Sequence, residues 1–224
     1  MALILCIETS TEVCSLALAC DGDVIFSRQC PTTQSHASQL PVFVLEALDF
    51  TKQQSLTIDA VAVSAGPGSY TGLRIGVSTA KGICYALRCP LIAVDTLQLI
   101  ALAATTTSER VRPMIDARRM EVYTALYSLD GKQQSPVEAV VVDANSFQNE
   151  LSEHSICFCG NGAMKCADVI THPNASFLEG IVPLATTMAK VVEAKYQSGA
   201  FEDVAYYEPF YLKEYTAIKP KKLF

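Results

Sequence analysis

Two loops of the sequence carry residue types that could hold a phosphate group. The first, Ile7-Glu8-Thr9-Ser10-Thr11, places one carboxylate and three hydroxyl groups directly after an apolar run. A carboxylate can hold a metal ion through water, and hydroxyl groups with backbone amides can hold phosphate. The same pattern is also typical of a polar hairpin turn. Glu8, Ser10 and Thr11 are therefore candidate nucleotide-binding residues, with a plain turn as the alternative.

The second loop is the glycine-rich run from Gly66 to Gly76, which leads from an expected strand into an expected helix. Glycines ahead of a helix allow close backbone approach, and free amides at a helix start suit an anion. The run lacks the Gly-Lys-Ser/Thr of a Walker loop and the glycine spacing of a dinucleotide fingerprint. Gly66, Gly68 and Ser69 are the candidate ligand residues here. The alternative is a tight turn that feeds a closely packed helix.

Hydrolytic and metal chemistry find little support in the sequence. The three histidines, His36, His154 and His172, are isolated, and no pair has metal-ligand spacing. The C-x-C motif at 157–159 has no second pair, so a zinc site is not expected. The nine cysteines show no framework spacing and predict reduced thiols. We therefore predict neither a catalytic residue nor a metal site.

Composition limits the classes of partner. Half of the 224 residues are hydrophobic, 18% are charged, and the net charge is −6, so a sizeable core is expected and the whole chain is not an electrostatic surface for nucleic acid. No apolar run has the roughly 18 residues that a membrane span needs, and the first residues lack the features of a secretory signal. We expect a soluble, cytoplasmic protein with no membrane contact. RNA contact would need a partner or a local basic patch.

Hydrophobic periodicity then predicts the elements that position these loops. Over residues 1–107 the order is strand, strand, strand, helix, strand, helix, strand, helix, with helices expected at 35–52, 72–87 and 96–105. Residues 108–224 repeat the pattern in shortened form, with further strands and a helix expected at 185–196. The duplication predicts an α/β fold of two lobes, 1–107 and 108–224, each with a mixed sheet.

The hairpin that opens the second half contains Asp116-Ala117-Arg118-Arg119, at the place that corresponds to the Glu8 loop. Two arginines at this position argue against a second nucleotide clamp, and an exposed turn with a local ion pair is the expected alternative. The second lobe is therefore not expected to bind nucleotide.

The helices expected at 35–52 and 72–87 carry more apolar and small residues than one buried face requires. Such a surplus indicates a second buried surface, supplied either by a partner or by the other lobe of the same chain. The residues predicted to form a partner interface are Leu40, Phe43, Ala47, Phe50, Gly72, Gly76, Val77, Ala80 and Ile83.

Five segments together resemble the bacterial TsaB family, also called YeaZ, in order along nearly the whole chain. They are Ile7–Glu12, the glycine run 66–76, Pro90–Leu97, Ile115–Arg118 and Tyr207–Leu212, with Gly-Pro-Gly-Ser-Tyr-Thr-Gly-Leu-Arg the most specific. The resemblance implies the actin-like ATPase, sugar kinase and heat-shock (ASKHA) fold of two duplicated lobes. It also implies a role in making threonylcarbamoyladenosine in tRNA.

The catalytic relative of that family, TsaD, carries a metal-binding H-x-x-x-H after a Gly-Val-Asn strand end. In this sequence the strand end is Ala93-Val94-Asp95, and the histidine positions are occupied by Thr96 and Ile100. Threonine is a poor ligand and isoleucine is none, so the resemblance implies a non-catalytic scaffold. It further implies binding to TsaD, assembly with the ATPase TsaE, a homodimer when alone, tRNA contact through the complex, and ATP or ADP only at the complex interface. Glu8 stands where many members of this fold have aspartate.

Two other functions are left open by the residues. One is a phosphotransferase of the sugar-kinase type that uses Glu8 and the Gly66 loop, and the other is a metallopeptidase, which the lack of a histidine pair disfavours. A basic tail with Lys213, Lys219, Lys221 and Lys222 could add affinity for phosphate, although such a run is more often a solvated terminus.

Overall fold

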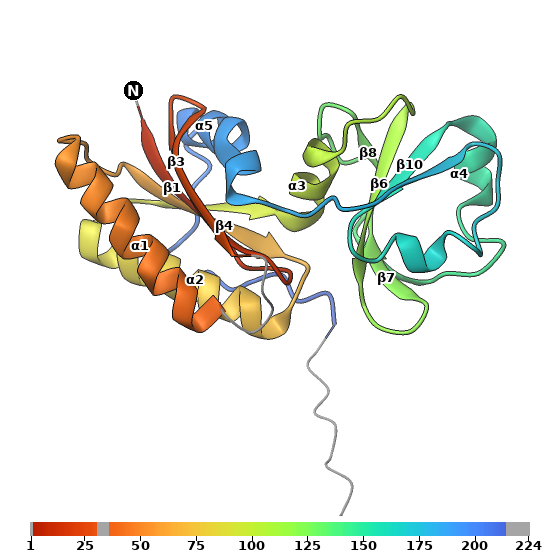
Figure 1. Ribbon diagram of the computed structural model, residues 1–224, viewed down its shortest axis with the longest axis horizontal. Helices are drawn as coiled ribbons and strands as arrows, with labels where there is room; N and C mark the ends of the chain where they lie inside the picture. The colour runs from red at the N-terminus through yellow and green to blue at the C-terminus, as the bar shows by residue number, and fades with distance from the viewer. Residues whose placement is uncertain (1, 31–35, 214–224) are drawn as a thin grey trace, which may run out of the picture.

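The structure is a computed structural model that describes residues 2–30 and 36–213 (Figure 1). Two lobes lie side by side, each built around its own β-sheet. Ser35 and the tail lysines at 219, 221 and 222 lie outside the described residues. Within the described part of the chain, no helix has the length and apolar character to cross a bilayer.

The sheet of the first lobe contains five strands in the order β3-β2-β1-β4-β5. Its strands are β1 (Leu3–Glu8), β2 (Cys14–Cys20), β3 (Asp23–Cys30), β4 (Ala60–Gly66) and β5 (Leu91–Asp95). The first three strands are joined by antiparallel hairpins, and β4 and β5 add in parallel to β1. Asp21 and Gly22 both have positive φ angles, 49° and 83°, as the expected tight turn requires. The predicted order of elements is confirmed for this lobe.

Helices cover both faces of that sheet. α1 (His36–Gln53) and α2 (Tyr70–Leu87) lie together on one face, where they bury one side of β1, β2 and β4. The opposite face is covered by the 3₁₀ turn η2 (Ala185–Met188) and by α5 (Ala189–Gln197). The second face of this sheet is therefore covered only when the chain returns from the second lobe.

The sheet of the second lobe repeats the first pair by pair. Its main strands, in the order β9-β7-β6-β10-β11, are β9 (Glu138–Val141), β7 (Glu121–Thr124), β6 (Arg110–Asp116), β10 (Ile156–Cys159) and β11 (Ala175–Leu178). Antiparallel pairing on one side of β6 and parallel pairing on the other match the pairing around β1. A short strand, β8 (Tyr127–Ser128), pairs with β6. The predicted duplication is confirmed, with β11 as a strand that the sequence pattern did not indicate.

The predicted boundary at residue 107 does not separate the elements of the two lobes. α3 (Thr96–Ala103), which precedes the boundary, lies between them: Ile100 packs in the core of the second lobe and Leu99 in that of the first. Residues 185–197, which follow it, pack on the first sheet (Figure 1). The division into 1–107 and 108–224 therefore needs correction, because Ala185–Met188 and α5 belong to the first lobe.

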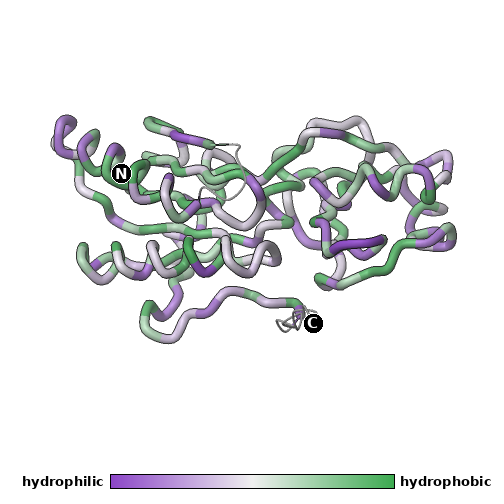
Figure 2. The backbone as a smooth tube through the Cα atoms, turned by 60° about the horizontal axis from the view of Figure 1, so that its bottom comes forward, coloured by the Kyte–Doolittle hydropathy of each residue, from purple (hydrophilic) through white to green (hydrophobic). Residues whose placement is uncertain are grey.

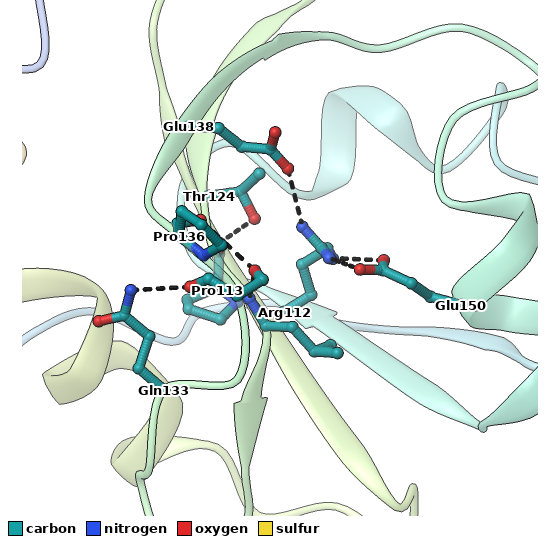
Figure 3. Close-up of polar contacts among 9 residues, drawn as sticks. Arg112, Pro113, Thr124, Gln133, Pro136, Glu138 and Glu150 are labelled. Carbon is teal, nitrogen blue, oxygen red and sulfur yellow. Dashed lines mark hydrogen bonds and ion pairs between the residues drawn. The ribbon is translucent and has the colours of Figure 1, made fainter.

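The second lobe has only short helices, and its core contains a buried arginine side chain. Besides α4 (Gln148–Glu153) and the 3₁₀ turn η1 (Met164–Cys166), its core includes Arg112, whose side chain is 1% exposed. Both carboxylate oxygens of Glu150 lie 2.5 Å from Nη2 of Arg112, and Glu138 lies 3.7 Å from Nη1 (Figure 3). The guanidinium also lies 4.4 Å from the centre of the Phe147 ring. Burial of this arginine is thus balanced by two carboxylates.

Candidate functional site

The structure brings together the two loops that the sequence marks as a possible phosphate site. The amide of Ser69 donates to the carbonyl oxygen of Ser10 at 2.7 Å, and the Thr9 hydroxyl donates to the carbonyl oxygen of Gly72 at 2.8 Å. A Cβ atom at Gly68, Gly72 or Gly76 would overlap with Ser10 or Thr9. The glycines therefore serve close packing of α2 onto the β1–β2 loop, as the second interpretation of the run predicted.

Two amides at the start of α2, those of Ser69 and Gly72, are already bonded within the chain. Ser69 is the N-cap of α2, its hydroxyl accepts from the amide of Gly72, and its own amide binds Ser10. Gly66 is equally enclosed, because a Cβ there would lie 2.6 Å from the carbonyl oxygen of Phe210. Nucleotide binding at this site stays a prediction. The two loops contact each other in this structure, so they would have to separate before a nucleotide could bind between them.

Glu8 lies fully buried beneath this contact. One of its oxygens, Oε1, accepts from the amide of Ser10 at 2.6 Å and from the Ser10 hydroxyl at 2.5 Å. Burial raises the pKa of Glu8 to about 7, and the hydrogen bonds from Ser10 act in the opposite direction. The other oxygen and the Thr11 hydroxyl are buried with no hydrogen-bond partner among the described residues. A carboxylate in this setting is sealed from solvent rather than presented to a substrate.

The positions that the resemblance aligns with a histidine pair lie on α3. Asp95 ends β5 and caps this helix, because its side chain accepts from the amides of Leu97 and Gln98 at 2.7 and 3.4 Å. Thr96 and Ile100 are both fully buried. Ile100 packs in the core between α3 and the second sheet. These two side chains therefore contribute to the interior that joins the lobes.

The predicted partner residues divide into two groups. Seven of them are buried within the chain, where they pack on the first sheet or the β1–β2 loop; they are Leu40, Phe43, Ala47, Gly72, Gly76, Val77 and Ala80. Phe50 and Ile83 remain partly exposed, and Phe50 contacts the Phe26 ring of β3 at 5.3 Å. The prediction that Gly72, Gly76 and Ala80 contact a partner is wrong, because the chain's own β1–β2 loop and first-lobe core cover them. The lobe's own sheet and loops cover most of the surplus apolar surface.

A different face of the same two helices is exposed. A groove of about 490 Å³ runs between them, lined by Ala37, Pro41, Tyr70, Thr71, Arg74, Ile75, Ser78 and Thr79. Leu45 lies one turn beyond Pro41 on the same stripe of α1 and is 63% exposed. Val42 and Tyr85 are further exposed side chains of α1 and α2. We name the groove and the exposed side chains beside it the α1–α2 outer face. In the sequence this face is indicated by apolar residues spaced four apart in α1, at Ala37, Pro41 and Leu45.

The last described residues form a strap along α2. Lys81 donates to the carbonyl oxygens of Ala205 and Tyr207 at 3.0 and 3.1 Å, and Tyr211 stacks near Tyr70 with ring centres 4.9 Å apart. Figure 2 shows this segment running beside the helix toward the middle of the molecule. Lys213 then binds Glu121 of the second lobe at 2.5 Å. The Tyr207–Leu212 motif thus lies against the glycine loop, where the amide of Phe210 donates to the carbonyl oxygen of Ala65, and Lys213, which follows the motif, links the lobes.

Known proteins share this sequence pattern and fold. The family of tRNA N6-adenosine threonylcarbamoyltransferases, TsaD, matches residues 30–219. The chain is 31% identical to the tRNA threonylcarbamoyladenosine biosynthesis protein TsaB of Escherichia coli over 226 residues, 96% of each chain. It is 33% identical to TsaB of Bacillus subtilis over 142 residues, 63% of this chain and 61% of that one. The structure of YeaZ from Pseudomonas aeruginosa superposes with a TM-score of 0.78 at 26% identity, over 95% of this chain and all of that one.

The duplicated sheets and the family match define an α/β protein of the ASKHA class that is related to the TsaD transferases. Within that class, the chain belongs to the TsaB (YeaZ) family. The fold that the sequence resemblance implied is confirmed.

Proposed function

We propose that this protein is a non-catalytic subunit in tRNA threonylcarbamoyladenosine biosynthesis, which binds and activates a TsaD-type transferase. The observation that carries the proposal is the chemistry at Thr96 and Ile100, where the catalytic relative has its metal-binding histidines. Both side chains are buried in the chain's interior. Neither side chain offers an imidazole, so a metal that would polarise the threonylcarbamoyl phosphate has no matching ligands here.

The partner surface in this proposal is the α1–α2 outer face. Its groove is bordered by two helices whose inner faces are fixed by the sheet, so the outer face is presented rigidly. Exposed Leu45, one helical turn beyond the groove residue Pro41, supplies apolar contact area beside it. In the proposed assembly this face binds the TsaD relative, and it forms a homodimer when the chain is alone. A TsaE-type ATPase and tRNA join through the complex in the cytoplasm, with ATP or ADP at the complex interface.

Activity measurements test the scaffold role. The lone chain should transfer no threonylcarbamoyl group to tRNA and should turn over negligible ATP, and transfer should appear when the TsaD-type protein is added with its substrates. Robust transfer by the lone chain would refute the proposal. Tight calorimetric binding of ATP and magnesium by the lone chain would support the phosphotransferase instead.

Two matched leucines test the surface. Leu45→Glu places a charge on the α1–α2 outer face, whereas Leu129→Glu places the same charge on the second lobe, at a side chain that is 52% exposed. We expect Leu45→Glu to weaken co-purification with the transferase at least tenfold and Leu129→Glu to leave it unchanged. Equal effects of the two substitutions would show that the partner binds elsewhere. Circular dichroism of both variants would check that each keeps the fold.

A further inference from the structure

A pair of cysteines lies at the end of α2, beside Tyr85 and outside the groove between α1 and α2. Arg88 ends the helix in the left-handed conformation, with φ 55° and ψ 41°, and the amide of Cys89 donates to the carbonyl oxygen of Cys84 at 3.2 Å. A hydrogen bond of this span closes a Schellman turn, and the side chains of the two residues that it joins commonly contact each other. In this protein both of those side chains are thiols.

The Cys84 side chain lies against the residue that follows Cys89. Sγ of Cys84 lies 3.5 Å from the carbonyl oxygen of Pro90, directly beside Cys89. A hydrogen bond between the two thiols lowers the pKa of Cys89 below its ordinary value and raises the pKa of Cys84. Cys89 is thus the thiol that ionises first, and the thiolate is the nucleophilic form.

The pair is also reachable from solvent. Both cysteines line an open hollow of about 530 Å³, together with Tyr85, Ala86, Arg88 and Val204. Cys84 is buried and Cys89 is half-buried, so a small reagent meets Cys89 first. This arrangement of an accessible thiol backed by a second thiol is the one that a two-step thiol exchange requires.

We propose that Cys84 and Cys89 are a reversible modification site, at which a low-molecular-weight disulfide converts the two thiols into an intrachain disulfide. In the first step the Cys89 thiolate attacks one sulfur of the reagent, the reagent's S–S bond breaks, and one thiolate leaves and takes up a proton. In the second step Cys84 loses its proton to solvent and its sulfur attacks the sulfur of Cys89, which releases the second reagent thiol. Two protein thiols are oxidised by two electrons, and one reagent disulfide is reduced to two thiols. The product staples the last turn of α2 to the start of the segment that leads into β5.

The tryptic map of the chain allows a direct test on the wild-type protein. Cleavage after Lys81, Arg88 and Arg110 places Cys84 in peptide 82–88 and Cys89 in peptide 89–110, and neither peptide contains another cysteine. The folded chain is incubated with glutathione disulfide, remaining thiols are alkylated, and the digest is analysed without reductant. We expect the linked 82–88/89–110 species to account for most of both peptides and to disappear on treatment with dithiothreitol.

Other cysteines provide the controls. Cys14 and Cys30 face each other across β2 and β3, but their link would join peptides 1–28 and 29–52 and is therefore distinguishable. Cys89→Ser should abolish the linked species, and Cys20→Ser, at another half-buried thiol, should leave it unchanged. Recovery of 82–88 and 89–110 only as separate alkylated or glutathione-bearing peptides would overturn the proposal. Oxidation confined to other cysteines would overturn it equally.

Discussion

The two lobes have the same strand pairing but use the end of their central strand differently. In the first lobe, Glu8 at the end of β1 is fully buried, and an 18-residue helix follows the glycine loop. In the second lobe, Asp116 at the end of β6 is exposed and pairs with Lys165, and only a three-residue 3₁₀ turn follows Gly160 and Gly162. The same backbone topology therefore supports a sealed loop in one lobe and an open, charge-paired loop in the other.

The two lobes also differ in the surfaces that they present. Long helices α1 and α2 give the first lobe a rigid outer face, which the short α4 and η1 cannot provide in the second. The second lobe instead contains the buried side chain of Arg112, which pairs with the partly exposed Glu150. It contacts the first lobe through α3 and through a hydrogen bond of 2.9 Å from Asn161 to Glu12. We infer that the first lobe carries the partner surface and that the second supports it.

The largest loss of stability is expected from a substitution next to the buried loop of the first lobe. In Gly76→Arg, a side chain must enter the space that the Thr9 hydroxyl occupies, and a charge must be buried without a partner. We expect a loss of at least about 4 kcal/mol, a large share of the roughly 5–15 kcal/mol that stabilises a typical domain. Soluble yield and the circular dichroism signal should both collapse.

Gly82→Arg is the matched control on the same helix, because a Cβ at Gly82 meets no atom within 4 Å. This variant should fold as the wild type does. If Gly76→Arg folds equally well, α2 is not packed tightly on the β1–β2 loop in solution. The proposed contrast with the exposed Asp116 loop of the second lobe would then be wrong.

The sequence predicted the elements better than it predicted their neighbours. Helices expected at 35–52 and 72–87 lie at 36–53 and 70–87, because apolar residues at helical spacing are a local signal. Which sheet a helix covers is not a local property: α5 packs on the sheet of the first lobe, and α3 packs between the two lobes. The spacing of apolar residues within each helix does not indicate this. β11 was missed because its four residues are only partly buried and carry a weak alternation.

The candidate site shows the same limit. The sequence placed Glu8 and the glycine run correctly at strand ends, and the topology brings them together. It could not show that Thr9 and Ser10 fill the space between them, because that depends on how deeply α2 docks. The surplus of apolar residues in α1 was real, but Phe50 contacts Phe26 of the chain's own edge strand. A count of apolar residues does not say which surface covers them.

A second prediction concerns the pH dependence of stability. The folded pKa of Glu8 is about 7 against an ordinary value of 4.5, so the folded chain keeps a proton that the unfolded chain loses as the pH rises between these values. Stability must therefore fall over this window, by about 3 kcal/mol in total if Glu8 acts alone. Glu8→Gln should abolish that loss, so that it is the more stable protein at pH 8 and close to the wild type at pH 4.5.

Urea unfolding at a series of pH values measures this effect. Asp116→Asn, at the corresponding place in the second lobe, keeps Glu8 and should keep the decline. A decline of equal size in Glu8→Gln would show that Glu8 is not sealed in the folded state.

A third prediction compares ion pairs of the two lobes by double-mutant cycles. In the second lobe Arg112 is 1% exposed and pairs with Glu150, which is 33% exposed. Arg28 and Glu46 pair at 2.5 Å on the surface of the first lobe, with side chains 48% and 42% exposed. With Arg→Met and Glu→Gln at each site, the buried pair should show a coupling of about 2 kcal/mol and the exposed pair less than about 1 kcal/mol. Equal couplings would mean that water reaches Arg112.

The smallest expected effect lies on the outer side of α2. Gly82→Ala adds a methyl group where no atom lies within 4 Å and removes the conformational freedom that glycine has in the unfolded chain. Thermal and urea unfolding should show a gain of about 0.5–1 kcal/mol. The same substitution at Gly76 should destabilise, because its methyl group would overlap with Thr9. Opposite signs from one substitution, six residues apart, would demonstrate that one side of this helix is packed tightly onto the loop while the other side is open to solvent.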